Sequence, residues 1–270
     1  MKTSRRFLNR FYLYLVLAFF YLPIFVLIFY SFNASKSRTV WGGFTLKWYG
    51  KLFSDQMILN SVYVTLAVSV LAALIATALG TAAAIGIMAM KKRMRTVFVN
   101  VTYLPILSPE IIMGVSLMLL FVWACGSLNF GTLLLAHVSF DTPYVIFSVM
   151  PKLRQLDPHL YEAAQDLGAH PATAFRKVVL PQIRPGIITG MLLAFTLSVD
   201  DFVISYFTSG DNSQTLSIAI YAMTRKRVSP EINALSTLLF LFVLLFLIII
   251  NVRQAGGENS QQRKEIRDEI

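Results

Sequence analysis

The sequence predicts an all-α, polytopic membrane protein with six transmembrane helices. Hydrophobic residues make up 56% of the 270 residues, only 14% are charged, and the mean hydropathy is +0.63. Long uncharged runs recur along the chain, and about 20 apolar residues are enough for a helix to cross a bilayer core. No soluble domain of useful size fits between these runs. We therefore expect one transmembrane domain over residues 1–252 and a polar tail over residues 253–270.

The net charge of +10 does not indicate a nucleic-acid partner, because the basic residues lie in short clusters between the apolar runs. That placement is typical of membrane proteins, in which lysine and arginine set orientation and contact anionic lipid headgroups. The single cysteine, Cys125, excludes a disulfide within this chain and a thiolate metal cluster. The three histidines, His137, His159 and His170, lack metal-ligand spacing. We expect structural roles for them and no metal site.

The first predicted span is the uncharged run from Phe11 to Phe32, which follows four basic residues. At about 22 residues it is too long for the core of a signal peptide, and no small-residue cleavage site follows it. Pro23 is tolerated inside a membrane helix because neighbouring groups can satisfy the freed backbone. Residues 33–57 then form a polar loop rich in aromatic residues, including Trp48.

The second span lies within residues 56–90, which carry no charge, and it stops at the basic cluster of residues 91–95. Its roughly 35 residues would extend about 52 Å as a helix, so the span is long, tilted or partly outside the bilayer. The third and fourth spans lie within residues 96–151, separated by a glycine-rich turn at residues 126–131. Pro105 and Pro109 are candidates for a break in the third span.

A polar stretch from Asp157 to Pro181 separates the fourth span from the fifth. Asp157 can cap a helix of about ten residues that begins at Pro158 and closes at Gly168 in the left-handed conformation. A second short helix begins at residues 170–171. We expect it to end at Pro181, because the residue before a proline avoids the helical region.

The fifth span is predicted from about Pro185 to Phe207 and the sixth from Ile232 to Val252. The segments on one side of this six-span arrangement, including both termini and the 157–181 stretch, carry 17 of the 24 lysine and arginine residues. Cytoplasmic loops of membrane proteins carry the excess of positive charge. The bias predicts that both termini are cytoplasmic.

Four carboxylates fall inside the predicted spans: Glu110, Asp141, Asp200 and Asp201. Each costs about 2.5–3.5 kcal/mol at the centre of a membrane helix, so such residues usually face a cavity or a partner. At the helical rise, Glu110 and Asp200 lie about 22 Å from the cytoplasmic side and Asp141 about 16 Å. Side chains of adjacent helical residues diverge by about 100°, so Asp200 and Asp201 cannot point the same way.

No lysine or arginine lies within the predicted spans, so the four acids cannot form ion pairs with such residues inside the membrane part of this chain. They require a partner subunit, water, a proton or a cationic substrate. The alternative is a structural role, in which helical backbone or partner-subunit donors satisfy each buried carboxylate. The sequence leaves both readings open.

A family resemblance rests on the polar stretch. The string Glu162-Ala163-Ala164, followed by Gly168 and then by Val178-Val179-Leu180-Pro181, resembles the EAA loop of the permease subunits of bacterial ABC importers, with Val178 where that family usually has isoleucine. The resemblance implies the type I importer permease (MetI-like) fold. It also implies that the loop, residues 155–181, couples to a cytoplasmic ATPase. The implied coupling residues are Glu162, Ala163, Ala164, Gly168, Leu180 and Pro181.

Five further strings resemble the PotC-type permeases of spermidine/putrescine importers over most of residues 11–250: SFNASK, FTLKWY, SPEIIMG, FTLSVDDFVIS and VSPEINALST. In that family the matching positions are associated with polyamine passage, which implies pathway roles here for Trp48, Glu110, Ser198, Asp200 and Asp201. We add Asp141 to this set on the depth argument. Spaced carboxylates with aromatic faces suit a flexible polycation. Trp48 is an equally good interfacial anchor.

The resemblance implies a permease subunit of an ATP-driven polyamine importer in the bacterial inner membrane. Its partners would be a second, PotB-like permease, a dimer of a PotA-like ATPase, a PotD-like extracytoplasmic binding protein, the polyamine and membrane lipid. No P-loop motif occurs, so the chain is not expected to be an enzyme or to bind a cofactor, and ATP and Mg would sit on the ATPase. The rival hypotheses are an ABC importer for another substrate and a proton-coupled secondary transporter.

Overall fold

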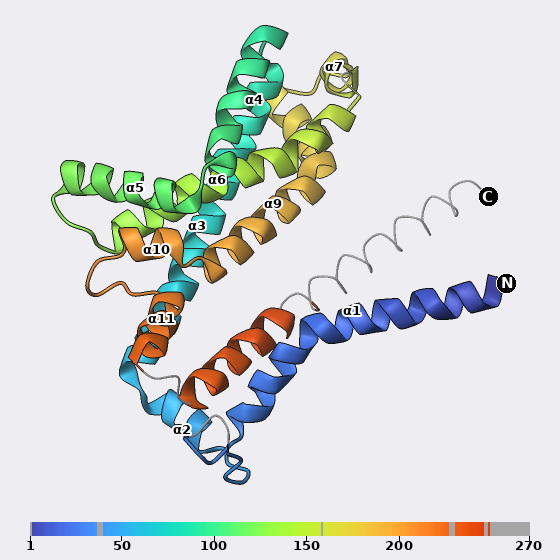
Figure 1. Ribbon diagram of the computed structural model, residues 1–270. Helices are drawn as coiled ribbons and strands as arrows, with labels where there is room; N and C mark the ends of the chain where they lie inside the picture. The colour runs from blue at the N-terminus through green and yellow to red at the C-terminus, as the bar shows by residue number, and fades with distance from the viewer. Residues whose placement is uncertain (1, 37–39, 158, 227–229, 246–247, 249–270) are drawn as a thin grey trace. The chain divides into compact units, whose positions relative to one another are not determined.

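Helices make up nearly all of the computed structural model, which describes residues 2–36, 40–157, 159–226, 230–245 and 248 (Figure 1). Among these residues the only β-type pairing is an isolated bridge between Asn33 and Phe44. The chain divides into two compact units. Unit 1 comprises residues 1–56 and 222–270, and unit 2 comprises residues 57–221. The all-α prediction is confirmed for the described residues.

Unit 1 contains α1 (Lys2–Ser31), α2 (Lys47–Ser54) and an apolar helix at residues 230–245. Pro23 lies inside α1 without ending it, as predicted. The loop between α1 and α2 is organised by Asn33, whose side chain accepts from the Gly42 amide at 2.8 Å and donates to the Val40 carbonyl at 2.9 Å. They add to two backbone hydrogen bonds across the loop, from the Ala34 amide to the Gly43 carbonyl at 2.9 Å and from the Thr45 amide to the Phe32 carbonyl at 2.8 Å.

The long helices of unit 2 are α3 (Gln56–Ala89), α6 (Phe130–Gln155) and α9 (Leu180–Asp200). Helices α6 and α9 pack closely because glycines of α9 face α6. A Cβ on Gly186 would lie 2.8 Å from the Ser148 carbonyl oxygen, and one on Gly190 would lie 3.2 Å from Ser148 Cβ. Such small residues let the backbones of membrane helices approach. Close packing also explains Gly80 of α3, whose Cβ would lie 2.7 Å from Val145 Cβ.

The third predicted span is broken. It consists of α4 (Lys92–Leu107) and α5 (Glu110–Cys125), which meet at an angle of 100° across Ser108 and Pro109 (Figure 1). Pro105 lies inside α4, so Pro109 is the proline at the break. The predicted turn after α5 is also present, because Gly126 has a left-handed φ of 73° and Asn129 caps α6.

The fifth predicted span differs from the expectation in two respects. Its helix ends at Asp200, and a separate helix, α10 (Val203–Thr208), follows, so the prediction of one span from Pro185 to Phe207 was wrong. Asp201 has φ −63° and ψ 129°, which takes the backbone out of the helix. We call the junction of α9 and α10, residues 201–202, the elbow. Helix α11 (Leu216–Lys226) follows a short turn.

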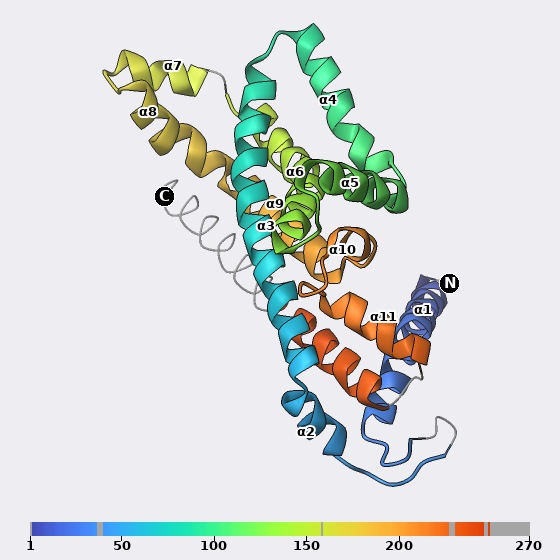
Figure 2. The ribbon, with the colours of Figure 1, turned by 90° about the vertical axis from the view of Figure 1, so that its left-hand side faces the viewer.

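The polar stretch forms α7 (His159–Asp166), α8 (Pro171–Ala174) and a π-helical turn at Phe175–Val179. Asp157 caps α7 by accepting from the His159 amide at 3.0 Å, and Gly168 has the predicted left-handed φ of 86°. Pro158 lies outside the described residues. Figure 1 and Figure 2 place α7 at the same end of unit 2 as the start of α4.

The prediction that the second short helix ends at Pro181 was wrong. Leu180 keeps helical dihedral angles of −57° and −42°, and the helix continues through Pro181 into α9. The π-helical turn accounts for this, because the Leu180 amide reaches back five residues to the Phe175 carbonyl. A wider turn relieves the clash between a proline ring and the preceding turn. Residues 171–200 therefore form one continuous helix of 30 residues.

In the described part of the chain, four helices are long and apolar enough to cross a membrane, and the bent pair α4 and α5 adds a fifth span if it is counted as one. The helix at residues 230–245 is apolar but shorter. The predicted count of six is therefore not confirmed. The end of the predicted sixth span and the tail at residues 253–270 lie outside the described residues.

Candidate functional site

A buried polar cluster joins three helices of unit 2, and His137 of α6 is at its centre. The imidazole is 1% exposed. Its Nδ1 lies 2.6 Å from the Ser198 hydroxyl of α9, and its Nε2 lies 3.0 Å from the Ser205 hydroxyl of α10. Nε2 also lies 3.6 Å from the Asp201 carboxylate. One histidine thus contacts both sides of the elbow, where α6 lies beside α9 and α10 (Figure 1).

Asp201 is held by the helix that follows it. Its carboxylate accepts from the Ile204 amide at 3.2 Å and from the Ser205 amide at 2.7 Å. These amides belong to the first turn of α10, which has no partners within its own helix. The break in the span therefore supplies the donors that a buried carboxylate requires. This is the structural reading that the sequence left open.

Asp200 points away from this cluster. It is exposed at the end of α9, whereas Asp201 is 9% exposed, so the two side chains have different surroundings, as expected. The reason differs from the expected one, because Asp201 is extended and no longer part of the helix. Glu110 is also exposed, as the first residue of α5 after the 100° bend. The two exposed acids thus occur at helix ends next to breaks. The pathway roles predicted for them stay predictions.

Asp141 differs from the other three acids. It lies one turn after His137 on α6, is completely buried, and neither carboxylate oxygen has a hydrogen-bond partner among the described residues. Ser198, by contrast, is buried and bonded to His137. Neither side chain lines an open surface of unit 2 in this conformation.

Trp48 belongs to unit 1, whereas the four acids belong to unit 2. Its ring is 3% exposed, its indole N–H donates to the Asn33 carbonyl at 2.7 Å, and the Lys47 ammonium lies 5.7 Å from the ring centroid. The indole therefore stabilises the loop after α1 in this structure. Its predicted contact with substrate stays a prediction.

The predicted coupling residues occupy a solvent-facing part of unit 2. Glu162 and Ala163 are exposed on α7, Ala164 is half-buried, and Gly168 is exposed at the turn between α7 and α8. Leu167, beside that glycine, is 90% exposed, which is unusual for a leucine and leaves a free apolar side chain on the loop. Leu180 and Pro181 lie in the helix that continues into α9.

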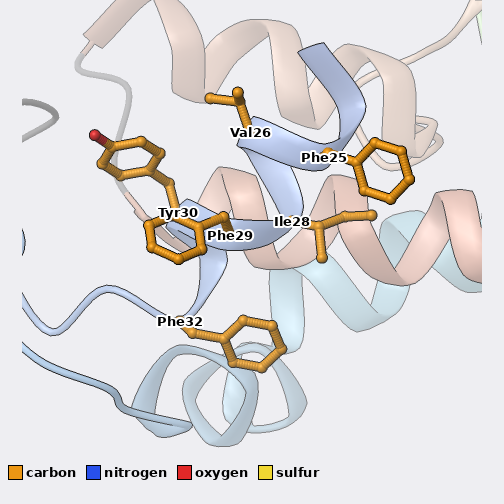
Figure 3. A pocket seen from close by; sticks show the side chains of 6 residues that line it. All are labelled: Phe25, Val26, Ile28, Phe29, Tyr30 and Phe32. Atoms are coloured by element: carbon orange, nitrogen blue, oxygen red, sulfur yellow. The ribbon is translucent and has the colours of Figure 1, made fainter. Parts of the chain in front are cut away.

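An apolar hollow on α1 offers no polar site. It has a volume of about 490 Å³ and is lined by side chains close to the end of the helix (Figure 3): Phe25, Val26, Ile28, Phe29, Tyr30 and Phe32. A polycation would find no carboxylate there. Within the described residues, no group of three or more histidine, cysteine or acidic side chains is arranged to hold a metal ion.

Sequence reasoning missed His137 and Ser205 as members of the cluster. The histidine was expected to be structural, but its partners lie 61 and 68 residues away, and only the packing of α6 against α9 and α10 brings them together. One local signal was present. Asp201 precedes the first turn of α10, and aspartate is a preferred helix-capping residue.

Comparison with known proteins identifies the family. Residues 76–255 match the binding-protein-dependent transport system inner membrane component. The putrescine transport system permease protein PotI of Escherichia coli (strain K12) is 42% identical over 228 residues, covering 82% of this chain and 81% of that protein. The spermidine/putrescine transport system permease protein PotC of Haemophilus influenzae is 36% identical over 246 residues, covering 91% and 96%.

A solved structure supports the fold. The chain resembles one in the crystal structure of a bacterial ABC transporter involved in the import of the acidic polysaccharide alginate. The TM-score is 0.73 at 16% identity, covering 93% of this chain and 97% of the other. The chain therefore belongs to the family of binding-protein-dependent transport system inner membrane components, as a multi-pass permease subunit of an ABC importer.

Proposed function

We propose that this chain is the permease subunit of an importer for the polyamines spermidine and putrescine. The observation that carries the proposal is the identity of 36–42% to spermidine/putrescine and putrescine permeases over more than four fifths of the chain. The match to the family supports a transport component and not an enzyme.

The position of the acids supports a cationic substrate. Asp200 and Glu110 expose carboxylates at helix breaks, where backbone and water can solvate them without a fixed cation from this chain. A polyamine carries several ammonium groups on a flexible chain, and each can form a charge-assisted hydrogen bond with such a carboxylate. In the proposed pathway Asp200 and Glu110 contact the substrate in this conformation. Ser198, Asp201, Asp141 and Trp48 would meet it only after a rearrangement.

The continuous helix from residue 171 to residue 200 supports a direct mechanical link. It begins in the coupling loop and ends at Asp200, and its 30 residues correspond to about 45 Å. We propose that α7 and α8 dock on the ATPase with Leu167 as an apolar contact. ATP-driven closure of the ATPase would then move this helix as a lever and open the pathway to the other side.

The proposal includes partners and an orientation. A homologous second permease would complete the pathway, two ATPase subunits would contact the coupling loops, and an extracytoplasmic binding protein would deliver the polyamine. The coupling loop and the basic cluster at residues 91–95 lie at the same end of unit 2 (Figure 2), which supports a cytoplasmic position for both. Both termini would then be cytoplasmic.

The test is uptake of radiolabelled putrescine and spermidine by cells that lack this chain and by the same cells complemented with it. The proposal predicts that uptake is lost on deletion and restored by the chain, but not when the partner ATPase carries an inactivating P-loop substitution. Uptake that is indifferent to deletion would remove the polyamine assignment. Restored uptake with the inactive ATPase would favour a proton-coupled transporter.

A further inference from the structure

The elbow between α9 and α10 needs something to hold its angle. At a helix break the backbone loses its intrahelical hydrogen bonds, and two helices joined by two residues can swing unless other contacts hold them. Asp201 caps α10, but its carboxylate and the two amides that bond to it all come after the end of α9 in the chain. The capping bonds therefore stabilise α10 without fixing its direction relative to α9.

His137 supplies the missing contact. Its two ring nitrogens bond to Ser198, three residues before the elbow, and to Ser205, three residues after it. Because an imidazole is rigid and planar, these two bonds set the separation of the two serine hydroxyls. The ring is fixed in turn because α6 packs closely along α9 through Gly186 and Gly190.

The rest of α10 is also tied to α6 and α5. Thr132 of α6 donates to the Thr208 carbonyl at the end of α10 at 3.1 Å. On the other side, a Cβ on Gly114 of α5 would lie 2.9 Å from Phe207 Cδ2, so α5 and α10 are in close contact. The direction of α10 therefore affects α5, whose first residue is Glu110.

We propose that His137 is a positioning residue for transport. By bonding to Ser198 and Ser205 it fixes the elbow, and the elbow sets where Asp200, at the end of α9, and Glu110, through α5, present their carboxylates. The effect on the elbow stands on the contacts of His137 alone. The effect on transport rests on the proposed function.

Substituting asparagine or glutamine for His137 tests the two hydrogen bonds of the ring one at a time. The amide of asparagine can take the place of Nδ1, and that of glutamine the place of Nε2. His137→Asn should therefore keep the bond to Ser198, and His137→Gln should keep the bond to Ser205. His137→Leu removes both. Thr142→Ala is a matched control on α6, because the Thr142 hydroxyl donates to the Val138 carbonyl of its own helix.

The first readout follows the elbow directly and needs no substrate. The assembled transporter carries Cys125→Ser together with Val203→Cys, at the half-buried first residue of α10, and the rate of maleimide labelling at position 203 is measured. His137→Leu removes both bonds and should raise the rate about tenfold, within the range expected for the loss of two buried hydrogen bonds. His137→Asn and His137→Gln should give smaller increases, and Thr142→Ala none.

Serine substitutions give the decisive pattern. With His137→Asn, adding Ser198→Ala should raise labelling further while Ser205→Ala should not. With His137→Gln the two serines should exchange roles. This crossed dependence does not require that His137→Leu folds. The proposal would be overturned if Ser198→Ala and Ser205→Ala raised the labelling rate equally in both the His137→Asn and the His137→Gln backgrounds. A wild-type labelling rate with His137→Leu would also overturn it.

The second readout is the amount of polyamine imported for each ATP hydrolysed by the transporter in proteoliposomes. His137→Leu should lower this ratio about tenfold while ATP hydrolysis continues, because misplaced carboxylates fail to pass the cation. Loss of import and hydrolysis in equal proportion would indicate general misfolding and contradict a positioning role. A crossed labelling pattern with no polyamine import by the wild type would leave the elbow inference intact and refute the proposed function.

Discussion

Asp201 and Asp141 are both buried acids of unit 2 near His137, yet only Asp201 has hydrogen-bond partners among the described residues. Asp201 lies at the elbow and accepts hydrogen bonds from two amides of α10, with His137 close by. Asp141 lies in the middle of the unbroken α6, away from the free amides of a helix N-terminus, and both of its oxygens lack a partner among the described residues.

The difference shows what a helix break provides. An unbroken helix satisfies its own backbone and has nothing to offer a carboxylate, whereas a new N-terminus exposes free amides. Breaks therefore allow this chain to keep acids in an apolar setting. The other break, between α4 and α5, also has an acid in the first turn that follows it, Glu110.

The largest effect is expected for Asp201→Ala. It removes the acceptor of two buried amides, so we expect a loss of about 2–3 kcal/mol in unfolding free energy. Asp201→Asn keeps one acceptor and should lose about half as much. Thermal unfolding of the complex in detergent measures both. Equal stability of Asp201→Ala and wild type would show that α10 does not need its cap.

A smaller effect is expected where unbroken helices pack. Gly80→Ala forces a methyl group against Val145, one turn from Asp141, and should cost about 1–2 kcal/mol. Gly86→Ala on the same helix is the control, because apart from the nearby backbone of its own helix nothing lies within 4 Å of the added Cβ. Because alanine has a higher helix propensity than glycine, Gly86→Ala should stabilise the protein slightly. The same unfolding assay compares them, and similar melting temperatures for the two variants would contradict the close contact of α3 with α6.

Asp141→Asn should change stability little, or increase it by up to about 1 kcal/mol, because a buried carboxylate without a partner is costly. This is opposite in sign to the change at Asp201. If polyamine uptake falls while the melting temperature holds, Asp141 belongs to the pathway. A large loss of stability would mean that Asp141 has a stabilising partner, and it would contradict the contrast with Asp201.

The smallest effect concerns the surface of unit 1. Lys51 donates to Glu231 at 2.6 Å, and this hydrogen bond, together with the attraction of the carboxylate, raises the pKa of the Lys51 ammonium. A raised pKa means that the contact stabilises below the ordinary lysine pKa and loses its effect as pH rises through the folded value. The contact is exposed, so Glu231→Gln should cost below about 1 kcal/mol, and less in high salt. A cost that is unchanged between pH 8 and pH 11 would contradict the assignment.

Much of the fold was predictable because its signals are local. Long uncharged runs predicted most of the apolar helices, and Asp157 and Gly168 predicted the limits of α7. Pro105 and Pro109 were both candidates for the break in the third span, and only Pro109 lies at it. The error at Pro181 has a physical reason. A π-helical turn lets a helix pass a proline, and nothing in the composition of residues 175–179 indicates that turn.

Asp201, a preferred helix-capping residue, was the one local signal of the elbow, and no local signal marked its histidine. Residues 201–202 contain neither proline nor glycine, so no breaker marks the end of α9. The break depends on Asp201 capping α10 and on His137 bonding to both sides, and those contacts exist only once α6 packs against α9 and α10. The sequence could single out the four acids but not separate the two buried ones, Asp141 and Asp201, from the two exposed ones.

The most direct test of the account is the initial rate of labelled putrescine and spermidine uptake by the complete transporter carrying Asp200→Asn, at matched membrane levels and with the ATPase still bound. Asp211→Asn, an exposed acid in the turn before α11, is the control. Loss of a charged contact with the substrate predicts at least a tenfold fall for Asp200→Asn and none for the control. Uptake by Asp200→Asn at the wild-type rate would contradict a cation pathway lined by acids at helix breaks.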